Sequence, residues 1–246
     1  MPQRLDAEIA ELIEALDGGG EPEEGVLAAI LRRPSCPGEL VERLARCNWV
    51  MGSPRLLQLL VKHPRCPRHF AWEALTRLGW HDLVEIARAP RTAPAIRAQS
   101  ERKLLERVPN LTLGERTALA RVAPRGVIGA LLSSEEPLCV EALLNNPLFT
   151  ETEALRLLTA NRNPLCLLAL LRHPAWGRRP EIVKSAVRVR GVPLGVALGL
   201  LPSLPARDLA GLASSPEVAA PLRSAAARLV ESRNDRGASR TRSTPS

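Results

Sequence analysis

The 246-residue sequence predicts an all-α protein, an α-solenoid of short stacked helix pairs with no β-sheet. Hydrophobic residues make up 45% of the chain and aromatic residues only 2%, so the core must be built from Leu, Ala, Val and Ile. The chain has 22 prolines, which interrupt helices. A proline-marked motif also recurs every 26–30 residues over most of the chain, which is typical of a repeat architecture. No run alternates apolar and polar residues with period two, so we expect no sheet.

The repeat is clearest in three segments of similar sequence: Leu31-Arg-Arg-Pro-Ser-Cys-Pro37, Val61-Lys-His-Pro-Arg-Cys-Pro67 and Leu171-Arg-His-Pro-Ala-Trp-Gly177. With three weaker copies, the marker prolines are Pro34, Pro64, Pro90, Pro147, Pro174 and Pro202. Their separations are 30, 26, 57, 27 and 28 residues. The gap of 57 residues corresponds to two repeats, with a degenerate marker near Pro124.

Each repeat is predicted to contain two short helices. Apolar residues at helical spacing, such as Leu40, Leu44 and Cys47, define the buried faces. Thr150 and Glu153 predict a capping box at the start of one helix. Prolines that follow the markers, Pro37, Pro67 and Pro205, are expected to open the next helix. Because single short helices are marginal in water, the pairs must stack on one another.

Composition divides the chain into three predicted parts. Residues 1–21 form an acidic amphipathic helix that ends in a glycine-rich hinge, Gly18–Gly20. Residues 22–232 form the repeat body. Residues 233–246 are rich in Arg, Ser and Thr and lack large apolar side chains, so we expect a disordered basic tail.

The recurring pattern, His or Asn followed by Pro-x-x-Pro and then by Leu-x-x-Leu, resembles leucine-rich repeat variant proteins and, more broadly, HEAT-like α-solenoids. The resemblance covers about residues 22–232. It implies a right-handed superhelix and a role as an interaction scaffold. The repeats here are long enough for two α-helices, whereas the variant family pairs an α-helix with a 3-10 helix. Some members of that family carry an iron–sulfur cluster on clustered N-terminal cysteines; this sequence lacks such a motif, so that property does not carry over.

Charge is unevenly distributed along the chain, whose net charge is +8. Residues 1–24 carry −7, residues 25–232 carry +12 and residues 233–246 carry +3. A basic body can attract an acidic protein, a nucleic acid or an anionic membrane surface. The alternative is a compositional bias, because the chain contains only three lysines beside its many arginines, as in coding sequences rich in G and C.

The location is predicted to be cytoplasmic. The N-terminus lacks the apolar core of a signal peptide. The longest nearly uncharged run, residues 191–207, contains three prolines and is shorter than the roughly 20 apolar residues that span a bilayer. We therefore expect no membrane insertion.

The sequence predicts no catalytic, cofactor-binding or metal-binding residue. His63, Cys66 and His69 form a His-x-x-Cys-x-x-His pattern, but His63 and His173 both precede a marker proline, which favours a structural role at a helix end. A HEAT-like DNA glycosylase is a weaker alternative, suggested by the basic body and by Trp49, Trp72, Trp80 and Trp176. No residue here matches the catalytic acid of those enzymes.

Positively charged residues recur two positions before the marker prolines: Arg32, Lys62, Arg88 and Arg172, with Arg33 beside the first. In stacked repeats, equivalent positions lie about 10 Å apart, so these residues predict a cationic ladder along one edge. Alternatively, each cation only caps its own helix C-terminus. We predict a non-enzymatic protein–protein interaction scaffold with an acidic protein partner and no cofactor. Nucleic-acid binding is the second hypothesis, and no oligomeric state is predicted.

Overall fold

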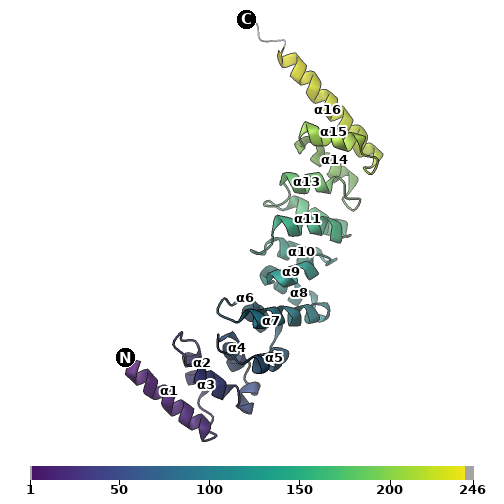
Figure 1. The fold of residues 1–246 in the computed structure, drawn as a ribbon. Helices are drawn as coiled ribbons and strands as arrows, with labels where there is room; N and C mark the ends of the chain where they lie inside the picture. Colours follow the sequence, from purple (N-terminus) through teal and green to yellow (C-terminus); the bar gives the residue numbers. More distant parts are fainter. Residues whose placement is uncertain (1, 242–246) are drawn as a thin grey trace. The chain divides into compact units, whose positions relative to one another are not determined.

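The computed structural model describes the backbone of residues 2–241 and the side chains of residues 7–235. Over residues 2–241 it contains sixteen α-helices and three 3-10 helices and no strand, which confirms the all-α prediction (Figure 1). The chain divides into two compact units between Thr112 and Leu113. The repeat spacing predicted one continuous body and gave no sign of this division.

The first unit consists of short helices, several of which contact the next helix but one; the consecutive pairs α4–α5 and α6–α7 also pack together. Contacts join α1 to α3 and α5 to α7, and likewise α2 to α4 and α4 to α6. Fully buried leucines such as Leu27, Leu60 and Leu83 fill the space between them. The elements are α1 (Pro2–Asp17), α2 (Glu24–Leu31), α3 (Gly38–Leu44), η1 (Asn48–Gly52), α4 (Pro54–Lys62), α5 (Arg68–Arg77), α6 (Trp80–Arg88), α7 (Pro94–Arg107) and η2 (Val108–Asn110).

The second unit follows the same pattern of alternate contacts. Helix α10 contacts α8 and α12, α11 contacts α13, and α14 contacts α16. The elements are α8 (Leu113–Val122), α9 (Arg125–Leu131), α10 (Pro137–Leu144), α11 (Glu151–Ala160), α12 (Pro164–Arg172), α13 (Pro180–Ala186), α14 (Leu194–Leu200), η3 (Leu201–Ser203), α15 (Ala206–Ser214) and α16 (Ala220–Thr241).

Prolines define many of the helix starts. The predicted helix openers Pro37, Pro67 and Pro205 stand one residue before α3, α5 and α15. A second set occupies the first helical position of α4, α7, α10, α12 and α13, where the missing N–H would have no intrahelical partner: Pro54, Pro94, Pro137, Pro164 and Pro180. The predicted capping box of α11 is present, and the Thr150 N–H donates to the Glu153 carboxylate at 3.0 Å.

Side chains at the turns tie each turn to the one about a repeat earlier. The buried Asn161 amide donates to the carbonyls of Leu132 (3.0 Å) and Ser134 (2.7 Å), which lie 29 and 27 residues before it. The Trp176 indole N–H donates to the Leu144 carbonyl, 32 residues before it, at 3.0 Å. These bonds satisfy carbonyls that a helix end leaves without partners.

Helix α1 is part of the first unit, and the predicted hinge after it is a hydrogen-bonded helix end. Ile9 and Leu16 are buried, and α1 contacts α3. Gly19 has a φ of 79°, and the Gly20 N–H donates to the Ala15 carbonyl at 2.8 Å. This left-handed cap ends the helix in a defined turn that favours glycine.

The predicted disorder of the basic tail is wrong for residues 233–241, because α16 continues to Thr241. The Arg233 guanidinium donates to the carbonyls of Leu204 (2.7 Å) and Pro202 (2.6 Å). The lack of large apolar side chains in the tail sequence did not reveal this polar contact. Residues 242–246 lie outside the described residues.

Candidate binding surface

The structure brings part of the predicted cationic ladder together. Arg32 and Lys62 line one hollow of 230 Å³ at the C-terminal ends of α2 and α4, where Arg91, after α6, joins them. Arg91 was not predicted, because it follows its marker proline instead of preceding it. Arg33 is exposed beside Arg32 but does not line the hollow.

The other two ladder residues, Arg88 and Arg172, do not line this hollow. Lys62 is neutralised by an ion pair with Glu85 at 2.5 Å. Arg88 is exposed and engaged in an interaction of its own, and it does not line the hollow. Arg172 belongs to the second unit, where it is exposed and forms no ion pair with any side chain of residues 7–235.

Positive charge is concentrated in the second unit. The first unit has sixteen basic and fifteen acidic residues, whereas the second has eighteen and eleven. Within the second unit, residues 156–207 hold nine basic residues against one acidic residue, Glu181. The nine are Arg156, Arg162, Arg172, Arg178, Arg179, Lys184, Arg188, Arg190 and Arg207. We call this group the basic segment; only its Arg179 and Lys184 form ion pairs with side chains of residues 7–235.

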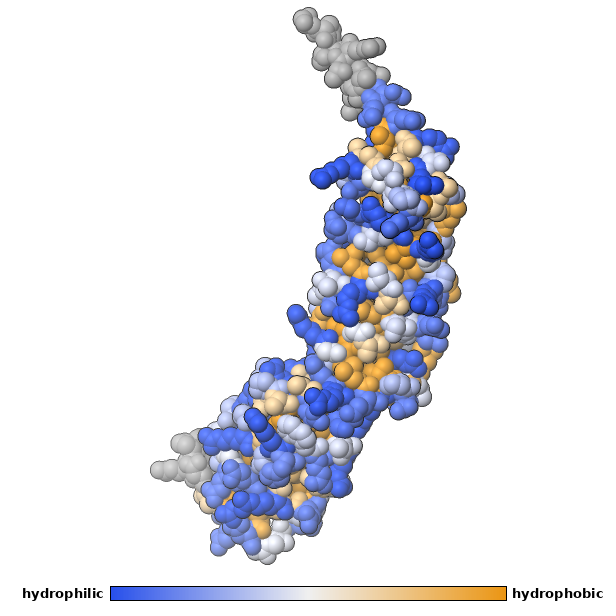
Figure 2. All heavy atoms as spheres, turned by 45° about the vertical axis from the view of Figure 1, so that its right-hand side comes forward, coloured by the Kyte–Doolittle hydropathy of each residue, from blue (hydrophilic) through white to orange (hydrophobic). Residues whose placement is uncertain are grey.

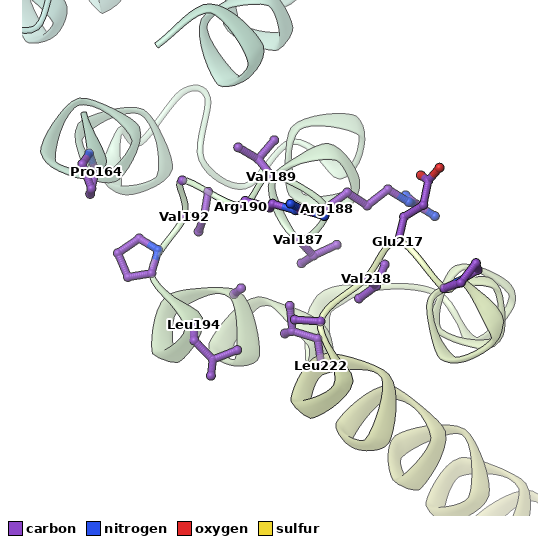
Figure 3. A pocket seen from close by; sticks show the side chains of 15 residues that line it. Pro164, Val187, Arg188, Val189, Arg190, Val192, Leu194, Glu217, Val218 and Leu222 are labelled. Carbon is purple, nitrogen blue, oxygen red and sulfur yellow. The ribbon is translucent and has the colours of Figure 1, made fainter. Parts of the chain in front are cut away.

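An apolar hollow of 670 Å³ opens beside the basic segment (Figure 3). Its walls are the loop between α13 and α14, the start of α14 and the turn that precedes α16. Val187, Val192, Val218 and Leu222 supply much of the apolar lining. The charged residues of the lining are Arg188, Arg190 and a single carboxylate, Glu217.

A second, more polar hollow of 550 Å³ shares Arg188 with the first. It lies between α13 and α15 and is lined by Lys184, Arg207 and Asp208. Lys184 and Asp208 form an ion pair at 3.1 Å, whereas Arg207 is exposed and forms no ion pair with side chains of residues 7–235. The basic segment therefore borders both hollows.

Three exposed leucines form the most exposed group of large apolar residues in the described chain. Leu138, Leu165 and Leu194 are 62%, 60% and 44% exposed. They follow the prolines that open α10 and α12 and precede α14, at spacings of 27 and 29 residues. We call them the leucine row. Hydrophobic side chains are prominent on the surface of the second unit in Figure 2.

The leucine row was not predicted, although the sequence contains a signal for it. The dipeptide Pro-Leu occurs five times, at 137, 147, 164, 193 and 221. The leucines after Pro137, Pro164 and Pro193 are exposed, Leu148 is half-buried, and Leu222 is buried in the wall of the apolar hollow. Because Pro164 and Leu194 also line this hollow, the row and the hollow are adjacent.

The histidine and cysteine pattern is part of the internal structure. His63 is buried, and its Nδ1 accepts a hydrogen bond from the Arg65 N–H at 3.2 Å. Burial raises the pKa of the Cys66 thiol to about 12, which keeps it protonated and unreactive. Within residues 7–235 no group of three His, Cys, Asp or Glu side chains is placed to hold a metal ion.

Two of the four tryptophans are engaged in internal packing. Trp176 lies edge-on to Phe149 with ring centroids 5.4 Å apart, and the Arg179 guanidinium lies 4.6 Å above its ring. Trp80 is 8% exposed and stacks on His81. Trp72, in contrast, is 40% exposed.

Comparison with protein-family models, curated proteins and solved structures finds no match to this chain. None of the described helices has both the length and the apolar character that a bilayer crossing requires.

Proposed function

We propose that this chain is a non-enzymatic α-solenoid scaffold that binds an acidic protein partner through the basic segment of its second unit. The observation that carries the proposal is the excess of nine basic residues over one acidic residue in residues 156–207. Four of the nine, Lys184, Arg188, Arg190 and Arg207, line two hollows, together with the carboxylates Glu217 and Asp208. A cationic surface of this kind attracts and orients an acidic partner. Of the predicted ladder residues, this proposal therefore uses Arg172, together with its basic neighbours in the second unit.

The solenoid architecture is supported by two regularities inside each unit. Alternate helices contact one another, as stacked helix pairs require. Turn side chains also bond carbonyls one repeat earlier; Arg107 bonds the Thr76 carbonyl, 31 residues before it, and Asn161 bonds that of Leu132, 29 residues before it. The right-handed superhelix implied by the family resemblance belongs to this proposal.

A protein partner is favoured over a nucleic acid by the leucine row. Protein interfaces combine arginine with an apolar, buried centre. Duplex interfaces are more polar, and most of their hydrogen bonds go to phosphate and sugar. A surface that places Leu194 in one hollow with Arg188 and Arg190 therefore suits a protein better.

The test compares two variants that each lose four positive charges. The first carries Arg162→Gln, Arg188→Gln, Arg190→Gln and Arg207→Gln; none of these residues forms an ion pair with side chains of residues 7–235. The matched control carries Arg32→Gln, Arg33→Gln, Lys62→Gln and Arg88→Gln in the first unit. Fluorescence anisotropy with labelled polyglutamate and with a labelled duplex, at several salt concentrations, measures binding.

We expect polyglutamate affinity to fall about tenfold or more in the second-unit variant and much less in the control. Absence of polyglutamate binding by the parent protein would overturn the proposal. Tight duplex binding, with a salt slope lowered by up to about 3.6 in the second-unit variant, would replace it with the nucleic-acid hypothesis. Equal losses of polyglutamate affinity in the two variants would show that binding depends on net charge and not on a local site.

A further inference from the structure

We infer that the leucine row and the adjoining apolar hollow bind an acidic amphipathic helix of the partner protein. This inference rests on the proposed function and names the chemistry of the segment that is recognised. The leucines supply apolar contacts and the neighbouring arginines of the basic segment supply charge.

The fold does not require leucine at these positions. The row occupies the second residue of α10 and α12 and the first residue of α14. In the first unit, the second residues of α2, α4 and α6 are Gly25, Arg55 and His81, all exposed. Glycine, arginine and histidine thus serve the same helix starts. Three exposed leucines in adjacent repeats then mark an interaction surface.

The spacing of the leucine row suits a helical ligand. Helices α10 and α12 are in contact, and packed helices lie about 8–10 Å apart, so Leu138 and Leu165 are separated by about that distance. Leu194 lines the same hollow as Pro164, the residue before Leu165. Seven residues of an α-helix rise about 10.5 Å, which matches this spacing. A ligand helix of about 18 residues with an apolar stripe can therefore contact all three leucines. Residues 2–241 contain no strand, so they offer no sheet edge to pair with an extended peptide.

The charge around the leucine row differs between its two ends. Arg162 lies two residues before Pro164, and Arg190 lies three residues before Pro193. Beside α10, in contrast, the exposed residues are Glu135 and Glu136. Ligand carboxylates are therefore favoured next to α12 and α14 and disfavoured next to α10. This asymmetry gives the bound helix a preferred direction.

The test uses two synthetic peptides of about 18 residues with identical composition of Leu, Glu and Ala. One places its leucines on a single helical face, and the other scatters them around the helix. The protein variant carries Leu138→Ser, Leu165→Ser and Leu194→Ser. The matched control is Leu105→Ser in the first unit, where the parent side chain is 38% exposed.

We expect the parent protein to bind the amphipathic peptide about tenfold or more tightly than the scattered peptide. The triple variant should lose this preference, whereas the Leu105→Ser control should keep it. Because the three leucines are exposed, the thermal melt of the triple variant should stay within about 2 °C of the parent.

Equal binding of both peptides by the parent would overturn the inference and leave the proposed function standing, because charge alone would explain the affinity. Binding of neither peptide would overturn both. Sedimentation of the parent protein and the triple variant tests whether a second copy of this chain binds to the leucine row. Self-association that depends on the leucines would assign the row to that contact and overturn the inference.

Discussion

Helices α4 and α12, one from each unit, share a local design. Each has nine residues and starts with proline, and the preceding Ser53 or Asn163 accepts a hydrogen bond from a backbone N–H of the first turn, at 3.2 and 2.9 Å. Each ends at a histidine, His63 or His173, whose Nδ1 accepts from the N–H two residues later, at 3.2 and 3.3 Å. Capping residues at equivalent positions therefore define the start and the end of both helices.

The two helices differ on their outer faces. Arg55 of α4 corresponds to Leu165 of α12, and both are exposed. Lys62 corresponds to Arg172, but Lys62 pairs with Glu85 and Arg172 has no ion-pair partner within residues 7–235. Caps and buried leucines thus determine the helix, and the outer positions are free to carry binding chemistry. The comparison predicts equal stability effects at matched buried sites and unequal binding effects at matched outer sites.

The largest expected effect is the loss of a matched core leucine. Leu60 and Leu170 occupy the same position in α4 and α12, and neither has exposed surface. Truncating either to alanine should lower the free energy of unfolding of its unit by about 2–5 kcal/mol. Denaturant melts of both variants provide the measurement. Leu165→Ala is the control, with an expected loss below about 0.5 kcal/mol. A large loss in only one unit would show that the matched helices are not equivalent.

Sequence alone located these helices but not their buried faces. Prolines at regular spacing predicted the turns, because proline is excluded from helix interiors and is favoured in the first helical turn. The run Leu165–Leu171 is apolar on every face, so its pattern does not show which face of the helix is buried. In the structure Leu167 and Leu170 are fully buried, whereas Leu168 is half-buried. Exposure of Leu165 depends on neighbouring repeats, which a single helix does not encode.

The candidate site was predicted only in outline. Net charge over residues 25–232 indicated a basic body, but averaging hid its concentration in residues 156–207. The ladder rule predicted that Arg32 and Lys62 lie near each other, and both line one hollow. It could not show that Glu85 neutralises Lys62, because that ion pair joins separate helices.

The next effect concerns a matched arginine anchor. Arg107 and Arg233 each donate to two carbonyls 29 and 31 residues earlier, Leu78 and Thr76 in the first unit and Leu204 and Pro202 in the second. Replacing either arginine with methionine keeps the apolar stem and leaves two carbonyls without these donors. We expect each variant to lose about 1–2 kcal/mol of stability, measured by thermal or denaturant melts.

Truncation sharpens the assignment of Arg233. Deleting residues 234–246 keeps the anchor and should change stability by less than about 0.5 kcal/mol. Deleting residues 233–246 removes it and should match Arg233→Met. If both truncations leave the melt unchanged, the Arg233 hydrogen bonds do not stabilise the second unit.

The smallest expected effect separates the two capping histidines by their response to pH. Burial lowers the pKa of His63, and the nearby Arg91 and Arg65 lower it further, whereas a hydrogen bond to the Cys36 backbone acts in the opposite direction. Burial alone lowers the pKa of His173, which is more exposed. The unfolded chain therefore takes up a proton first as the pH falls below about 6.5, and acid destabilises the fold.

Replacement of His63 by asparagine should remove this pH dependence without breaking the turn. Asn146, which precedes a marker proline, already makes the equivalent hydrogen bond: its Oδ1 accepts from the Leu148 N–H at 2.8 Å. Urea midpoints measured at pH 7 and pH 5 should differ less in His63→Asn than in the parent protein. His173→Asn should reduce the difference by a smaller amount, because no arginine adds to the effect of burial there. An unchanged acid shift in His63→Asn would mean that this buried imidazole does not control the stability of the first unit.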